Sequence, residues 1–215
     1  MKKIIIPLTL IVLISWPVLA GRNKAKVDRV PFCGFSSKKG FYYSDKPLEF
    51  ITKEAKVGDE TGIPEVVNAI EDKLGFNVAI TVYIAKEEDN CFATIANGKR
   101  LLIADHVFLS RANTEAGTKW AAISIIAHEI GHHIAGFNRH PSQLDSELDA
   151  DYWSGYALQK LGASEAASIK CIMHYGTDVD SDSHPAKTRR AQTIMLGYHD
   201  AQKGTYDKNR CESCN

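Results

Sequence analysis

Three residues of one predicted helix have the types and spacing needed to bind a metal ion and activate water. Residues 128–132 read His-Glu-Ile-Gly-His within the apolar-rich stretch 120–135. Helical residues four apart share a face, so the imidazoles of His128 and His132 can bind one tetrahedral Zn²⁺ ion. Glu129 lies at the edge of that face, where it can accept a proton from water without binding the ion. A surface helix with stray histidines is the plain alternative, and the apolar helical context argues against it.

A catalytic zinc ion has three protein ligands and one open position, so another segment must supply the third ligand. The metzincin pattern would need Gly and His three and six residues after His132, but Ala135 and Asn138 stand there. In the next predicted helix, Glu147 and Asp151 share a face, whereas Asp149 points roughly opposite. We therefore predict Glu147 as the third ligand, with Asp151 behind the metal site. Alternatively, the three acids only solvate the first turns of that helix, where negative charge is favourable.

The order of these motifs resembles that of the gluzincin metallopeptidases of the HtpX and CAAX-prenyl-protease type, over roughly residues 62–200. Four segments carry the resemblance: Asn90-Cys-Phe-Ala93, His128-Glu-Ile-Gly-His132, Glu147-Leu-Asp-Ala-Asp151 followed by Trp153-Ser-Gly-Tyr156, and Ser183-His184-Pro185 followed by Arg190. The spacing from the zinc helix to the third ligand is short, and the membrane helices of the best-known members are absent. These departures argue against prenylated or membrane-embedded substrates, and they leave the metal chemistry unchanged.

The resemblance also implies roles for residues outside the two ligand helices. His184 would donate to the oxyanion formed during peptide hydrolysis, or would cap the zinc ion as a fourth ligand. A loop histidine that simply packs beside Pro185 is the alternative. Arg190 would orient Asp151 or the His184 loop through charged hydrogen bonds.

One predicted strand is a candidate for holding the substrate. Residues 99–104 would form the edge strand of the sheet at the cleft, and an extended peptide could pair with its backbone. An ordinary hairpin edge without a ligand is the alternative. The residues predicted to line the substrate are Arg100, Leu101, Leu102 and Ile103.

The amino terminus has the pattern of a secretory signal peptide. Lys2 and Lys3 precede an apolar run over residues 4–20 that ends in Val-Leu-Ala. We expect cleavage after Ala20 and an exported protein, periplasmic or secreted, without stable membrane insertion; a retained N-terminal anchor is the less favoured alternative. The 26 basic and 26 acidic residues balance, and 24 basic residues remain after cleavage. No basic stripe indicates nucleic acid as a partner.

The five cysteines allow one or two disulfides in an exported protein, and the odd number leaves at least one thiol free or intermolecular. They are Cys33, Cys91, Cys171, Cys211 and Cys214. Cys211 and Cys214 form a CxxC in a polar C-terminal tail, where a disulfide that ties down the tail is the favoured interpretation. Redox activity and a second metal site are the alternatives.

The order of predicted elements, strands first and helices afterwards, indicates an α+β fold. A first helix begins near Pro64 and ends at Gly75, and a strand covers residues 78–85. Asn97-Gly98 then joins two strands of a hairpin, 91–96 and 99–104. The predicted helices that follow are the zinc helix ending near Gly136, one from Ser142 to Gly162, one over 164–173, and one containing residues 188–198.

These elements define four parts of the chain. Residues 1–20 form the signal peptide, and residues 21–60 form an N-terminal arm without an assigned role. Residues 61–205 form a zincin-like domain with a small antiparallel-edged sheet, the active-site helix and a helical C-terminal part. Residues 206–215 form the Cys-containing tail.

Three functions fit the sequence. The first is a zinc-dependent peptidase that cleaves protein or peptide substrates, with Glu129 as general base. The second is a latent or non-catalytic zinc-bound domain that binds misfolded or partner proteins, with His184 in the open position of the metal. The third is a structural zinc site in a secreted interaction protein. Glu129 beside the metal favours the first, because a structural site has no use for a general base.

Overall fold

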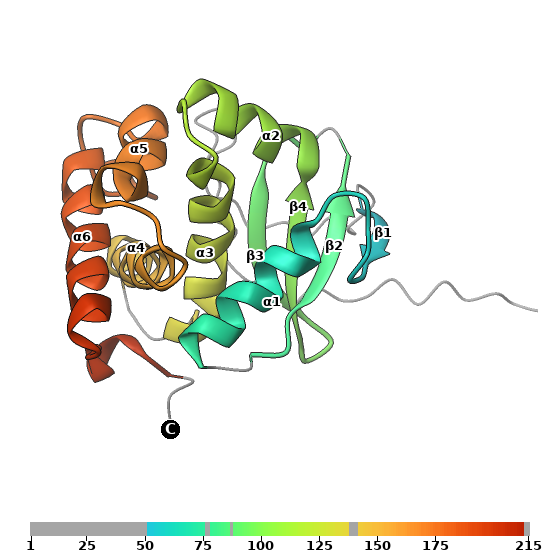
Figure 1. Ribbon diagram of the computed structural model, residues 1–215, viewed down its shortest axis with the longest axis horizontal. Coiled ribbons are helices and arrows are strands. Elements are labelled where there is room, and N and C mark those ends of the chain that lie inside the picture. The colour runs from blue at the N-terminus through green and yellow to red at the C-terminus, as the bar shows by residue number, and fades with distance from the viewer. Residues whose placement is uncertain (1–50, 76–77, 87, 138–141, 213–215) are drawn as a thin grey trace, which may run out of the picture.

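The computed structural model describes residues 51–75, 78–86, 88–137 and 142–212. Their fold is α+β, with a four-stranded mixed sheet followed by a helical part (Figure 1). The strands are β1 (Ile51–Ala55), β2 (Thr81–Ala85), β3 (Cys91–Ala96) and β4 (Lys99–Asp105). The helices are α1 (Ile63–Leu74), α2 (His106–Glu115), α3 (Trp120–Ala135), α4 (Gln143–Lys160), α5 (Glu165–Tyr175) and α6 (Lys187–Lys203).

The sheet order is β1-β2-β4-β3, and it corrects the predicted substrate strand. The Asn97-Gly98 hairpin forms as predicted, with both residues at positive φ. However, β4 also pairs in parallel with β2, so it lies inside the sheet with neighbours on both sides. The four residues predicted to line a peptide therefore do not lie on an edge strand: Arg100, Leu101, Leu102 and Ile103. The edge strand beyond β4 is β3.

Two elements were not predicted. β1, at the end of the predicted N-terminal arm, pairs antiparallel with β2 and belongs to the sheet. α2 lies between β4 and the zinc helix, and Asp105 caps it by accepting hydrogen bonds from the N–H groups of Val107 and Phe108. β2 also begins later than predicted, after Ala79 at φ 52°. The predicted signal peptide lies outside the described residues, as does most of the arm.

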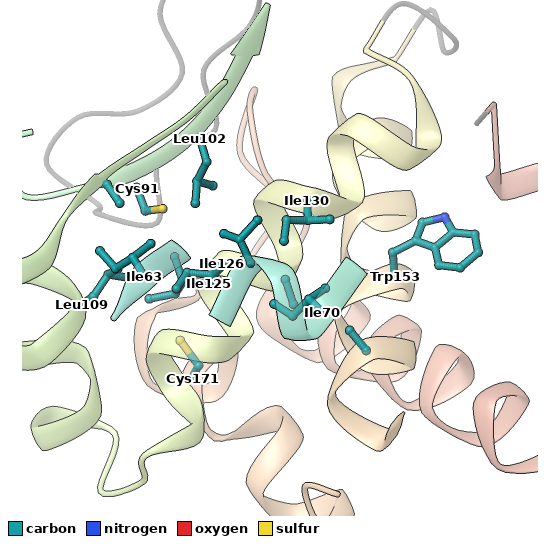
Figure 2. Close-up of a cluster of buried hydrophobic side chains, with 14 of the residues drawn as sticks. Ile63, Ile70, Cys91, Leu102, Leu109, Ile125, Ile126, Ile130, Trp153 and Cys171 are labelled. Carbon is teal, nitrogen blue, oxygen red and sulfur yellow. The ribbon is translucent and has the colours of Figure 1, made fainter. Parts of the chain in front are cut away.

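The main core begins between the sheet and three helices and continues among α3, α4, α5 and α6. Leu102 and Cys91 point from the sheet toward Ile63 of α1, Leu109 of α2 and Ile125 of α3 (Figure 2). All five of these side chains are buried. α3 is therefore a central helix with almost no solvent-facing side, which matches its apolar sequence.

Small residues bring the helices close enough to share a site. A Cβ on Gly131 would lie 2.7 Å from the carbonyl oxygen of Ala150, so a larger residue would push α4 away from α3. A Cβ on Gly197 of α6 would lie 1.9 Å from the carbonyl oxygen of Tyr152. As a result α4 lies between α3 and α6 (Figure 1). Backbone contact between α3 and α4 keeps the two predicted ligand helices at a short, fixed separation.

The C-terminal tail forms hydrogen bonds with both α3 and α4. The N–H of Glu212 donates to the carbonyl of Ile134 in the last turn of α3. Arg210 contacts α4 twice: its side chain donates to Asp149, and its carbonyl accepts from the indole N–H of Trp153. The tail therefore connects the C-terminal end of α3 to the middle of α4.

The structure describes three of the five cysteines. Cys91 and Cys171 are buried free thiols. Cys211 is disulfide-bonded, and Cys214 lies outside the described residues. Cys33 also lies outside them. Over the described part of the chain, no helix is both long and apolar enough to cross a membrane.

Candidate metal centre

Helices α3 and α4 bring His128, His132 and Glu147 together in the interior. One nitrogen of each imidazole and one carboxylate oxygen lie within 4.8 Å of one another, and all three residues are buried. The Nε2 atom of His128 is 3.2 Å from Oε2 of Glu147, and that of His132 is 3.6 Å from Oε1. This group could bind a metal ion, and it consists of the three residues predicted from spacing alone.

Asp151 and Arg190 hold His128 from behind. The Nδ1 atom of His128 lies 2.9 Å from Oδ1 of Asp151. Arg190 on α6 donates to both oxygens of Asp151, through Nε at 2.7 Å and Nη2 at 2.8 Å. Because the ionised carboxylate accepts a hydrogen bond from Nδ1–H, the lone pair of the neutral imidazole lies on Nε2 and faces the ligand cluster. Asp151 and Arg190 thus occupy the supporting positions predicted for them.

Glu129 joins the metal centre to the sheet. Its Oε2 atom accepts a hydrogen bond of 2.8 Å from the backbone N–H of Ala93 in β3. Its Oε1 atom is buried and has no hydrogen-bond partner among the described residues. Burial raises the pKa of Glu129 to about 8. One oxygen is thus fixed by the edge strand, while the other has no polar contact within the described part of the chain.

Unsatisfied atoms and charge both indicate a cation. Among the described residues, neither ring nitrogen of buried His132 has a hydrogen-bond partner, and burial lowers the pKa of this residue to about 3. Two buried carboxylates of lowered pKa, those of Glu147 and Asp151, face one buried guanidinium, that of Arg190, and Glu129 adds a further negative charge when it is ionised. With neutral histidines the excess is one negative charge, or two with Glu129 ionised, which a divalent cation would offset. The residues present therefore fit such an ion.

The same excess of negative charge favours the protonated form of His128. Burial alone would lower the pKa of His128, but the carboxylates of Asp151 and Glu147 outweigh it and raise the pKa to about 9. The pKa of Glu147 is lowered well below its ordinary value by His132 and His128, although burial opposes this. In the absence of a metal, a proton on His128 supplies part of the missing positive charge, and metal binding would displace it.

His184 also lies at this site. Its Nε2 atom is 3.7 Å from Oε2 of Glu147, and its Nδ1 atom is 2.8 Å from the hydroxyl oxygen of Ser183. With 14% of its side chain exposed, it is the most accessible of the imidazoles at the site. His184 therefore approaches the cluster from the solvent side.

Two further contacts at the site were not predicted, besides that between Glu129 and the Ala93 backbone. The side-chain amide of Gln143 donates a hydrogen bond of 2.9 Å to Oε1 of Glu147. The ring of Phe137 stacks on that of His132, with centroids 5.8 Å apart and planes 16° apart. Gln143 is four residues before Glu147, so the helical spacing used to find the ligands also points to it.

Two polar residues near the ligands face elsewhere. Asp149 binds Arg210 on the opposite side of α4, as its helical position predicts. His133 points toward the sheet, where its Nε2 atom lies 3.0 Å from the carbonyl oxygen of Leu101. Comparison of the whole chain with protein-family models, curated proteins and solved structures gave no match.

Proposed function

We propose that this protein is a zinc-dependent peptidase that hydrolyses peptide bonds in protein substrates. The observation that carries the proposal is the buried convergence of His128, His132 and Glu147, with Glu129 beside them. Two imidazoles and one carboxylate are a typical catalytic zinc set. A bound zinc ion would supply Lewis acidity and lower the pKa of coordinated water toward neutrality. The signal-peptide pattern further supports an exported, periplasmic or secreted, enzyme.

Glu129 is the proposed general base. The hydrogen bond from Ala93 fixes one oxygen, so the other can accept the proton of the attacking water and pass it to the leaving amine. A zinc ion beside Glu129 would favour the ionised form of its carboxylate, in which this group can accept a proton. His184, on the solvent side, is the proposed donor to the oxyanion.

The edge strand β3 supports a peptide as substrate. Among the described strands, β3 pairs only with β4, and the proposed binding mode is an extended chain added along its outer edge, where Glu129 already accepts the N–H of Ala93. Ala93 of this strand binds Glu129 directly, so a peptide on β3 would run past the general base. The proposed substrate strand is thus Cys91–Ala96, in place of the one predicted from the sequence.

A second candidate is a latent or non-catalytic zinc-bound domain that binds misfolded or partner proteins. The short distance between His184 Nε2 and Glu147 Oε2 favours it, because this imidazole could become a fourth ligand. X-ray absorption on the zinc-loaded protein separates the two functions. Three imidazoles and a carboxylate would support the latent form, and two imidazoles with a water would support the peptidase.

Glu129→Gln tests the peptidase. We expect one zinc ion per chain to be retained, because Glu129 is not a ligand. Cleavage of an unfolded protein such as reduced casein should fall by at least about 100-fold, because the base is lost. Glu165→Gln on the exposed start of α5 is the matched control and should cleave normally. Equal cleavage by the Glu129→Gln variant and the parent would contradict the mechanism.

A further inference from the structure

Gln143 contacts the buried site, but the proposed chemistry gives it no role. It is the first residue of α4, and its side chain reaches along the helix to Oε1 of Glu147, at 2.9 Å. Such contacts between residues four apart are common on exposed helix faces, where they contribute little. This one differs because its acceptor is a fully buried metal-ligand candidate.

The two oxygens of Glu147 have different surroundings. Oε2 lies near three nitrogens at the centre of the site: His128 Nε2 at 3.2 Å, His184 Nε2 at 3.7 Å and Arg190 Nη2 at 3.8 Å. Oε1 accepts the Gln143 amide and has one imidazole neighbour, His132, whose Nε2 atom is 3.6 Å away. The amide therefore binds one oxygen and leaves the other at the centre of the site.

We propose that Gln143 is a positioning residue that makes Glu147 a monodentate metal ligand. By binding Oε1, it fixes the carboxylate in the orientation that presents Oε2 to the ion. A carboxylate without such a partner can rotate to bind a metal through both oxygens, which would use the coordination position needed for water. This inference rests on the zinc site of the proposed function.

An amide suits this role because it donates without charge. A lysine at position 143 would form an ion pair with Glu147 and compete with the metal, and a second carboxylate would repel it. The neutral amide orients the ligand while leaving its negative charge for the ion. The N-terminal end of α4 therefore contributes both a ligand and the group that orients it.

The test compares Gln143→Leu with Gln159→Leu, a matched change near the other end of α4. Leucine keeps the approximate size of glutamine and removes the donor. Zinc affinity is measured by competition with a chromophoric chelator, and geometry from the visible absorption of the Co²⁺-substituted protein. For Gln143→Leu we expect about 10- to 100-fold weaker zinc binding and a change from a four-coordinate to a five-coordinate cobalt spectrum. Gln159→Leu should match the parent in both.

The spectrum distinguishes positioning from a loss of structure. A variant that was only destabilised would bind less metal with an unchanged spectrum per bound ion, and that result would overturn the inference. Parent-like affinity and spectrum would overturn it as well. If the parent itself bound no zinc, the proposed function would fail first, so the two failures are distinguishable.

Discussion

The two faces of α4 carry similar residues with different consequences. Asp151 on one face and Asp149 on the other are both buried, and each accepts a hydrogen bond from an arginine. On the tail side, Arg210 balances Asp149 and also lies over the ring of Tyr152. On the site side, Arg190 binds Asp151, but the carboxylates of Glu129 and Glu147 lie nearby as well.

The difference shows that charge balance separates a structural pair from a binding site. On the tail face Arg210 contacts one buried acid, Asp149, and one accessible acid, Asp207, and 25% of the Arg210 side chain is itself exposed. The site face has an uncompensated negative charge and buried imidazole nitrogens without partners. Buried groups of this kind are costly unless a ligand satisfies them. The same helix is therefore a structural element on one side and a candidate ligand helix on the other.

Glu147→Gln should have the largest effect on the site face. The amide keeps the shape of the ligand but removes the charge that draws the ion, and it binds zinc poorly. We expect zinc affinity to fall by more than about 100-fold, beyond the usual effect of changing a supporting residue. Equilibrium dialysis followed by metal analysis measures this. Unchanged zinc content would place the third ligand elsewhere.

Asp151→Asn should have the next largest effect. Asparagine keeps the size of the side chain but weakens the bond that holds His128 Nδ1–H, and it removes the negative charge that the Arg190 guanidinium contacts at position 151. Since supporting groups of this kind set ligand orientation, we expect about 10- to 100-fold weaker zinc binding. Chelator competition measures it, with circular dichroism to verify folding. Parent-like affinity would show that Asp151 does not support the metal.

Local patterns explain what could be predicted from the sequence. The helix that carries the His-Glu-Ile-Gly-His motif, α3, has an apolar sequence and is followed by Gly136. The next helix, α4, has a clear boundary residue, Ser142, before it. Helical spacing then sufficed to bring His128, His132 and Glu147 to one side and to send Asp149 to the other. His184 and Arg190 came from the family resemblance, since nothing in their spacing shows that their segments reach α4.

Non-local pairing explains what was missed. The hairpin signal at Asn97-Gly98 locates two strands but not the third strand beside them, so β4 was taken for the edge. β1 carries Lys53 and Glu54, which suit a short edge strand and hide its periodicity. The contact of Glu129 with the backbone of Ala93 has no side-chain signal on the strand at all.

Asp149→Asn is the matched control for Asp151→Asn and should have the smallest effect on the metal. It is the same change two residues away on the same helix, and it weakens the contact with Arg210 at the tail. Because a hydrogen bond between charged groups contributes about 1.5–3 kcal/mol, we expect the free energy of unfolding to fall by roughly that amount or less. Zinc affinity should stay within about twofold of the parent, since Asp149 faces away from the ligands. Urea unfolding and chelator competition measure the two quantities. If Asp149→Asn weakened zinc binding as much as Asp151→Asn, the faces of α4 would not be independent, and the tail would have to be counted among the elements that hold the metal.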